Sequence, residues 1–308
     1  MPVKQSQPLG ESQDRFALVH RSIVNAKGLF RRVGSESDYN AVLDVWWRST
    51  LGVYVRFWGP TLLGESEALV LVALLSIAGE SSRVKLREPH ASAKGAQNDV
   101  LSWLNSTVAT TIEVCVSLRQ LAAAIGLSTS GDSLLAVRRS LERLGAVSVW
   151  TGRADETRAS AMANHQLLKV SLADDGRLQV RLPPLLVDAL LGSRKDNTYV
   201  LLSSVLRLPA RGYARFLALR LSWINPGEVN AVSLETLAHY LWPDREPTAV
   251  ERSRLRASLK DLDGNGWFVS RKQTKSDEIY LIARKRDAGL PARPRRPRAA
   301  GKAEVRDI

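Results

Sequence analysis

One pattern of residues occurs twice in this chain. Ser117–Ala122 reads Ser-Leu-Arg-Gln-Leu-Ala, and Ser233–Ala238 reads Ser-Leu-Glu-Thr-Leu-Ala. Each segment is followed by a short turn, an amphipathic stretch with several arginines, a glycine and a short apolar run typical of a strand. The order helix, turn, helix, strand is that of a winged helix-turn-helix, so the sequence predicts two such units in tandem.

Capping signals support the first unit. Ser117 and Gln120 have the spacing of a capping box, in which each side chain bonds the other residue's backbone N–H. Gly126 ends that helix, and Ser130 or Asp132 can cap the next one. The second helix then has an apolar stripe at helical spacing, made of Leu134, Val137, Leu141 and Leu144.

The second unit repeats this logic. Pro243 and Asp244 break its first helix, and Thr248 with Glu251 forms another capping-box spacing at the start of the next. The buried stripe of that helix is predicted to consist of Leu255, Leu259 and Leu262. We therefore expect both second helices to present their charged residues away from the core.

Arginine suits the second helix of such a unit, because its guanidinium makes bidentate contacts with guanine in the major groove. The predicted DNA-binding residues on the two helices are Ser133, Arg138, Arg139, Arg143, Thr248, Arg252, Arg254, Arg256 and Lys260. The alternative is a solvated helix face with local ion pairs, such as Arg138 with Glu142. The repetition of the pattern favours DNA contact.

Two polar segments are predicted to be wings. The first is residues 151–163, with Arg153 and Arg158, and the second is residues 272–278, with Lys272 and Lys275. Both could equally be solvated loops. Strand-like runs at 165–170 and 178–182 flank Asp174-Asp175-Gly176, which is a hairpin signature.

The predicted fold class is α+β, with two tandem winged helix-turn-helix domains. Residues 1–27 are expected to form a flexible N-terminal arm. The two domains are expected at 28–192 and 193–284. Residues 285–308, rich in proline, arginine and alanine, are expected to be a disordered basic tail.

Charge and composition indicate a polyanionic partner. The net charge is +13 and the pI is about 10.2, which favours nucleic acid or an anionic membrane surface. The most apolar stretch, Ala68–Ala78, is too short to span a bilayer, so no membrane partner is expected. The N-terminus has no secretory signal pattern and there is one cysteine, Cys115; a cytoplasmic location is expected.

Enzyme signatures do not stand out. The chain has no phosphate-binding loop motif, and its four histidines have no metal-ligand spacing. Asp261 and Asp263 precede Gly264 at a predicted helix end, where turn chemistry explains them. We expect no catalytic residue, metal or cofactor. The tryptophans are expected to fill cores or cover interfaces, namely Trp46, Trp47, Trp58, Trp223 and Trp242.

The sequence also resembles a known family, the RepC replication initiators of IncQ-type broad-host-range plasmids. The resemblance runs from about Gly28 to Arg284. It rests most specifically on Trp223–Gly227 followed by Tyr240–Pro243. It also includes Gly28–Arg31, Gly59-Pro60 with Leu63-Gly64, Ala78-Gly79, Leu121–Gly126 and Ser140–Arg143.

The resemblance implies a function. Initiators of this family bind direct repeats (iterons) in the plasmid origin as double-stranded DNA and help to open an adjacent AT-rich stretch, where a plasmid-encoded helicase and primase act. A homodimer is possible. Two alternatives stay open: a tandem winged-helix repressor of the plasmid operon, and an enzyme of replication such as a primase, for which no acidic metal cluster is evident.

Overall fold

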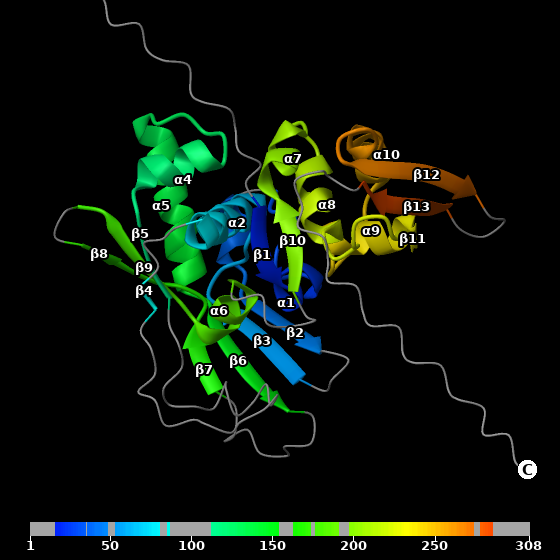
Figure 1. Ribbon diagram of the computed structural model, residues 1–308. Coiled ribbons are helices and arrows are strands. Elements are labelled where there is room, and N and C mark those ends of the chain that lie inside the picture. The colour runs from blue at the N-terminus through cyan, green and yellow to red at the C-terminus, as the bar shows by residue number, and fades with distance from the viewer. Residues whose placement is uncertain are drawn as a thin grey trace, which may run out of the picture.

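The computed structural model describes residues 16–34, 36–48, 53–80, 85–86, 112–153, 163–173, 176–190, 197–273 and 278–285. Helices and strands are mixed in this part of the chain, and the strands form small antiparallel sheets (Figure 1). The fold is therefore of the expected α+β class. None of the described helices is both long and apolar enough to cross a membrane.

The first repeat of the sequence pattern builds one helix-turn-helix unit with a sheet. Its elements are α2 (Glu65–Glu80), β4 (Lys85–Leu86), β5 (Ile112–Val116), α4 (Leu118–Ala124), α5 (Gly131–Gly145), β8 (Lys169–Leu172) and β9 (Leu178–Leu182). The sheet order is β4-β5-β9-β8. A strand from before the helix pair thus lies beside the hairpin that follows it.

The second repeat builds the same arrangement. Its elements are α8 (Ala214–Leu221), β11 (Val229–Ser233), α9 (Leu234–Leu241), α10 (Ala249–Leu262), β12 (Trp267–Gln273) and β13 (Glu278–Arg284). The sheet order β11-β13-β12 corresponds strand for strand to β5-β9-β8. Both units therefore share a helix, a strand, two helices and a two-stranded hairpin in this order, and the first unit has β4 in addition.

A further sheet combines two strands from before α2 with two strands from after α5. It consists of β2 (Leu43–Arg48), β3 (Val53–Gly59), β6 (Ser148–Arg153) and β7 (Ala163–Gln166), in the order β2-β3-β6-β7. A 3-10 helix, Glu36–Asn40, precedes it. The strand directly after α5 is β6, and it joins this sheet rather than the sheet of its own unit.

This pairing corrects the first predicted wing. Residues 151–153 belong to β6, residue 163 begins β7, and 154–162 lie outside the described residues. The hairpin that matches the β12–β13 hairpin of the second unit is β8–β9, with Leu172 paired to Leu178. The hairpin signature at 174–176 thus marks the hairpin that corresponds between the two units.

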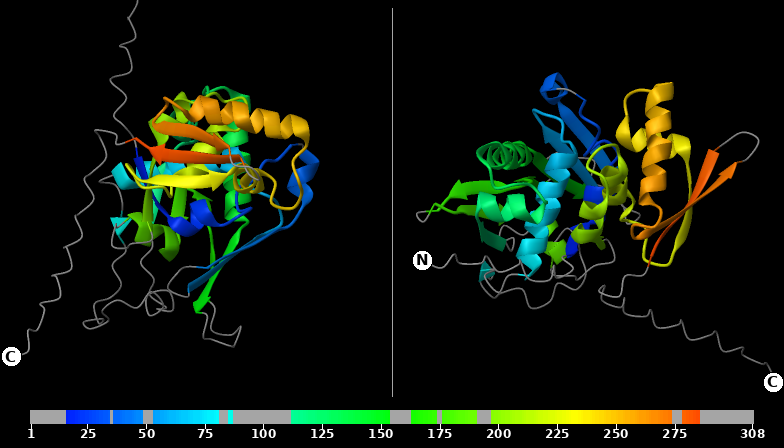
Figure 2. Two further views of the ribbon diagram at one scale, coloured as in Figure 1. Left: turned by 90° about the vertical axis from the view of Figure 1, so that its right-hand side faces the viewer. Right: turned by 90° about the horizontal axis from the view of Figure 1, so that it is seen from above.

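The centre of the molecule joins the two units. Here lie β1 (Phe16–His20), α1 (Arg21–Asn25), α6 (Pro184–Leu190), β10 (Asn197–Leu201) and α7 (Leu202–Arg207). β1 pairs with β10 from Phe16↔Leu201 to His20↔Asn197, and α2 packs against β1. Figures 1 and 2 show α5 and α10 on opposite sides of this centre.

The central pairing corrects the expectation of a flexible arm over residues 1–27. Residues 16–27 are part of the core: Val19 and Ala26 are fully buried. Arg220, also buried, donates to the carbonyl oxygen of Ala26 at 2.8 Å. A single cluster of buried residues runs through both units, so the chain does not separate into independent cores at the predicted boundary of 192/193.

α2 is the helix around which the first unit packs. Its residues from Glu67 to Ser76 are all buried, as expected for a stretch that is apolar on every side. It contacts α4, α5, α6, α7, α8 and β1. The long apolar run in the sequence is therefore a central core helix.

Candidate nucleic-acid interface

The helix pairs of the two units begin at well-formed caps. Ser117 accepts the N–H of Gln120 at 3.1 Å, and the side chain of Gln120 accepts the N–H of Ser117 at 2.9 Å. Ser233 caps α9 by accepting the N–H of Thr236 at 3.1 Å. Both expected starts are confirmed, and they satisfy backbone donors that the first helical turn leaves unpaired.

The turns between the helices differ in chemistry. In the first unit Gly126 has φ of +73°, a left-handed conformation that a side chain disfavours. In the second unit the turn is closed by Thr248 and Glu251, which form the predicted capping box. The N–H of Thr248 donates to Glu251 Oε2 at 2.8 Å.

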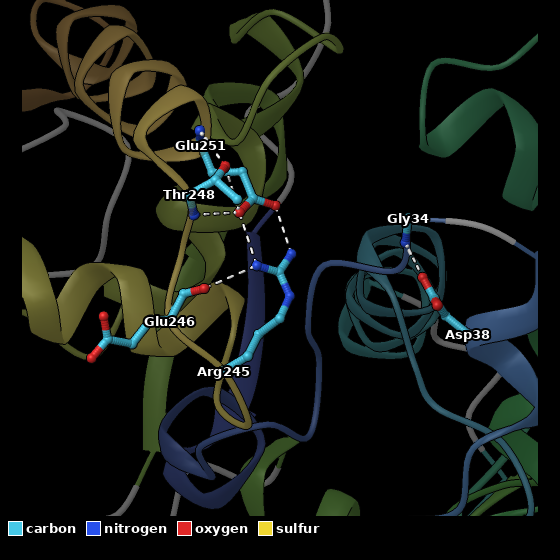
Figure 3. Close-up of polar contacts among 6 residues, drawn as sticks. All are labelled: Gly34, Asp38, Arg245, Glu246, Thr248 and Glu251. Atoms are coloured by element: carbon cyan, nitrogen blue, oxygen red, sulfur yellow. Dashed lines mark hydrogen bonds and ion pairs between the residues drawn. The ribbon is translucent and has the colours of Figure 1, made fainter.

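Arg245 reinforces this second turn. Its guanidinium donates to both oxygens of Glu251, at 2.9 and 2.6 Å, and to the carbonyl oxygen of Glu246 at 3.1 Å (Figure 3). The Arg245 hydrogen bonds hold the pKa of Glu251 down, at about 2. Turn and helix start are therefore held as one block, which fixes the direction of α10. In the same view Asp38 accepts the N–H of Gly34 at 2.6 Å.

The outer face of α10 presents cations to solvent. Arg252, Arg254 and Lys260 are exposed. Arg252 approaches the 93% exposed Glu246 at 3.4 Å, a surface pair that contributes little. These three side chains can therefore turn to a phosphate or a base without disturbing the core.

Arg256, also predicted to bind DNA, is engaged within the fold. Its Nε and Nη2 donate to the carboxylate of Glu278 at 2.8–3.1 Å, and Arg271 pairs with the same carboxylate at 3.0 Å. The Arg256 hydrogen bonds lower the pKa of Glu278. Arg256 therefore ties α10 to the first residue of β13, while 40% of its side chain stays exposed.

In the first unit, too, some arginines of the second helix are exposed and one is engaged within the fold. Arg138 and Arg139 are exposed on α5. Arg138 pairs with Glu142 at 2.9 Å, the local pair that the sequence allowed, with both side chains more than half exposed. Ser133, in the first turn of α5, shares a 2.8 Å hydrogen bond with Ser128.

Arg143 points into the molecule instead. Its Nη1 donates to Oε1 of the fully buried Glu67 at 2.9 Å, and its guanidinium lies 3.7 Å from the ring centroid of Tyr39. Ser140 and the N–H of Gly64 also donate to Glu67. Arg143, one of the residues expected to bind DNA, therefore pairs with a buried carboxylate between α2 and α5.

The hairpins that follow the two helix pairs also carry cations. Lys272 is exposed on β12, while Lys275 lies outside the described residues. On the β8–β9 hairpin of the first unit, Lys169 and Arg177 are exposed. Neither residue was among the predicted DNA-binding residues, although the hairpin signature between them indicates an exposed hairpin.

A groove of about 650 Å³ follows the second helix-turn-helix. Arg245, Arg252 and Arg256 line it together with His239. His239 is exposed in the last turn of α9. Among the described residues no group of three or more His, Cys, Asp or Glu side chains could hold a metal ion.

Comparisons with known proteins match this arrangement. The crystal structure of selenomethionine derivatives of domains 2 and 3 of RctB superposes with a TM-score of 0.53 at 10% identity. The match covers 87% of this chain and 99% of that one. A second crystal structure of RctB domains 2–3 gives a TM-score of 0.48 at 11% identity, covering 87% and 98%. At this identity the first match shows a shared fold alone.

Sequence comparison supplies the family. The comparison with curated protein sequences finds no match. The family model described as Replication protein C (RepC) matches residues 15–284, which include both helix-turn-helix units and the β1 strand that joins them. The chain therefore belongs to the replication protein C (RepC) family.

Proposed function

We propose that this chain is a plasmid replication initiator that works in the cytoplasm. It binds direct repeats (iterons) in the origin as sequence-specific double-stranded DNA, bends or opens the adjacent AT-rich region, and so allows the plasmid-encoded helicase and primase to load. The observation that carries this proposal is the pair of helix-turn-helix units on one continuous core. The RepC family model spans both units.

In this proposal both units are winged helix-turn-helix domains, and α5 and α10 enter the major groove. Exposed arginines there would read base edges, and the remaining cations would contact phosphates and fix the register. The proposed contact residues are Arg138, Arg139, Arg252, Arg254, Lys260 and Lys272, with Ser133 and Thr248 at the helix N-termini and Lys275 beyond the described part of the wing.

The joined core bears on the opening step. Two helices in successive major-groove faces must lie about 34–36 Å apart on the same side of the duplex. Because the two units share a core, a mismatch with straight DNA would be relieved by bending the DNA, not by rearranging the protein. Binding energy used to bend the duplex would help to weaken it nearby.

The test is a salt titration of binding to two duplexes, one with the direct repeats of the parent plasmid's origin and one scrambled. A preference of about 10³-fold for the repeats at physiological salt is expected. Equal affinities that fall together steeply with salt would mean contact with phosphates alone and would contradict the proposal.

Variants of α10 sharpen this test. The double variant Arg252→Ala with Arg254→Ala should lose more affinity for the repeat duplex than for the scrambled duplex, because base contacts are lost. Lys27→Ala is the control: it removes an exposed cation near α1 that belongs to neither helix pair. Equal loss on both duplexes would restrict the two arginines to phosphate contacts.

Opening of the origin separates initiation from repression. On a supercoiled plasmid carrying the origin, the protein should make thymines of the AT-rich stretch reactive to permanganate. A repressor would bind the same DNA without this reactivity.

A further inference from the structure

The sheet β2-β3-β6-β7 has an outer face of unusual composition. The pairing register places Trp46, Arg56, Trp150 and Asn164 opposite one another across the four strands. The neighbouring positions on this face are Asp44, Arg48, Tyr54, Trp58, Ser148 and Gln166. We call this set the tryptophan face.

The two sides of the sheet differ sharply in exposure. The inner side carries Val45, Phe57 and Val149, which are at most 5% exposed. On the tryptophan face Trp46 is 53% exposed and Trp58 is 43% exposed. These two tryptophans therefore do not fill the core, although their side chains rank among the largest apolar groups in any protein.

Cations are interleaved with these rings. The Arg56 guanidinium lies 5.1 Å from the ring centroid of Trp46, and Arg48 lies 5.2 Å from that of Tyr54. Asp44 holds Arg56 by hydrogen bonds of 2.8 and 2.6 Å. The arginines are thus positioned on the sheet while one third or more of each remains exposed.

We propose that the tryptophan face binds single-stranded DNA. Unpaired bases would stack on Trp46, Trp58 and Trp150, as bases do on exposed aromatic side chains. Arg48 and Arg56 would contact the phosphates, and the exposed amides of Asn164 and Gln166 would hydrogen-bond base edges.

Charge and geometry favour this occupant over others. A duplex hides the faces of its bases in its own stack, so exposed aromatic rings can stack only on unpaired bases. A protein partner would need apolar side chains opposite the rings and carboxylates opposite the arginines. A polyanion with π faces satisfies both groups at once, and the chain carries a net charge of +13.

This inference goes beyond the proposed function, because it uses neither helix-turn-helix. A strand released beside the repeats could be held on this face while α5 and α10 stay on duplex DNA. Figure 2 shows the β2–β3 hairpin extending away from α10. Duplex binding and single-strand binding can therefore fail separately.

The experiment titrates the full chain into a fluorescein-labelled oligothymidine of about 20 nucleotides and follows anisotropy and tryptophan quenching. Trp46→Ala with Trp58→Ala should weaken binding by about tenfold or more, since each stacked base is worth about 1–3 kcal/mol. Affinity for the repeat duplex should stay unchanged. Phe268→Ala removes an aromatic side chain of similar exposure on β12 and should leave oligothymidine binding intact.

Conservative variants distinguish stacking from apolar contact. Trp46→Phe with Trp58→Phe should retain most of the affinity, whereas the corresponding leucine pair should lose it, because leucine has no π face. Equal affinity of the leucine pair and the wild type would overturn the proposal. A wild-type chain that binds the repeat duplex but not oligothymidine would also overturn it. The same is true of alanine variants that change only the mass measured by sedimentation, because that result would indicate a self-association surface.

Discussion

At the scale of single residues, Arg143 and Arg139 have opposite roles although they lie one turn apart. Arg143 neutralises the buried Glu67, so Arg143→Ala should lower the free energy of unfolding by about 3 kcal/mol, because it leaves a buried carboxylate uncompensated. Arg139→Ala should change it by less than about 0.5 kcal/mol. Urea unfolding measures both. A double variant with Glu67→Gln that regains no stability would refute the pairing.

Glu251 gives the capping network a pH dependence. Its pKa falls from a usual 4.5 to about 2 in the folded protein, so its contribution is present above pH 4.5 and is lost as the pH falls toward 2. Glu251→Gln should cost about 1 kcal/mol at pH 7, and the deficit should shrink below pH 4.5. Denaturant unfolding across this range measures it. Glu246→Gln, at a 93% exposed side chain, is the control, and a deficit independent of pH would contradict the assignment.

At the scale of elements, the contact between α10 and the wing strand β13 rests on Arg256 and Glu278. Separate substitution by alanine should destabilise the second unit, and the double variant should cost less than the sum of the two, since partners in one network are coupled. Arg256→Ala should also lower the affinity for the repeat duplex and for the scrambled duplex by similar factors, because it loosens α10 rather than removing a base contact. Thermal unfolding measures the change in stability, and duplex titration measures the change in affinity. Additive stability losses would argue against the link.

At the scale of the whole molecule, one core joins both units. β1 pairs with β10, and the backbone N–H of Arg32 donates to the carbonyl oxygen of Leu241 at 3.1 Å. Arg220, whose pKa burial lowers to about 10, lies over the ring of Tyr240 at 4.9 Å. The two units are therefore expected to unfold together.

A fragment experiment tests this cooperativity. Residues 193–308 alone lack β1, so their strand β10 and the buried face of α8 lose their partners. The fragment should show no cooperative transition, whereas the full chain should show one. Circular dichroism during heating measures it. A fragment that melts at the same temperature as the full chain would mean that the second unit is independent.

Local patterns predicted much of each unit. Capping boxes at Ser117 and Thr248, the stop at Gly126 and the apolar stripes are all confirmed, because they depend on interactions between residues three or four positions apart. The hairpin signature at 174–176 worked for the same reason. The family, too, followed from local segments such as Trp223–Gly227.

Pairing across the chain decided the rest. Whether Phe16–His20 is an arm or a core strand depends on a partner about 180 residues away, and β6 joins β3 rather than the sheet of its own unit. The same holds for side chains: helical periodicity placed Arg143 and Arg256 off the apolar stripe, but Glu67 and Glu278 come from other elements. The sequence by itself determined the helix-turn-helix repeats, since short-range geometry encodes them, whereas only the tertiary structure decided which cations remain exposed and which tryptophans share a sheet face.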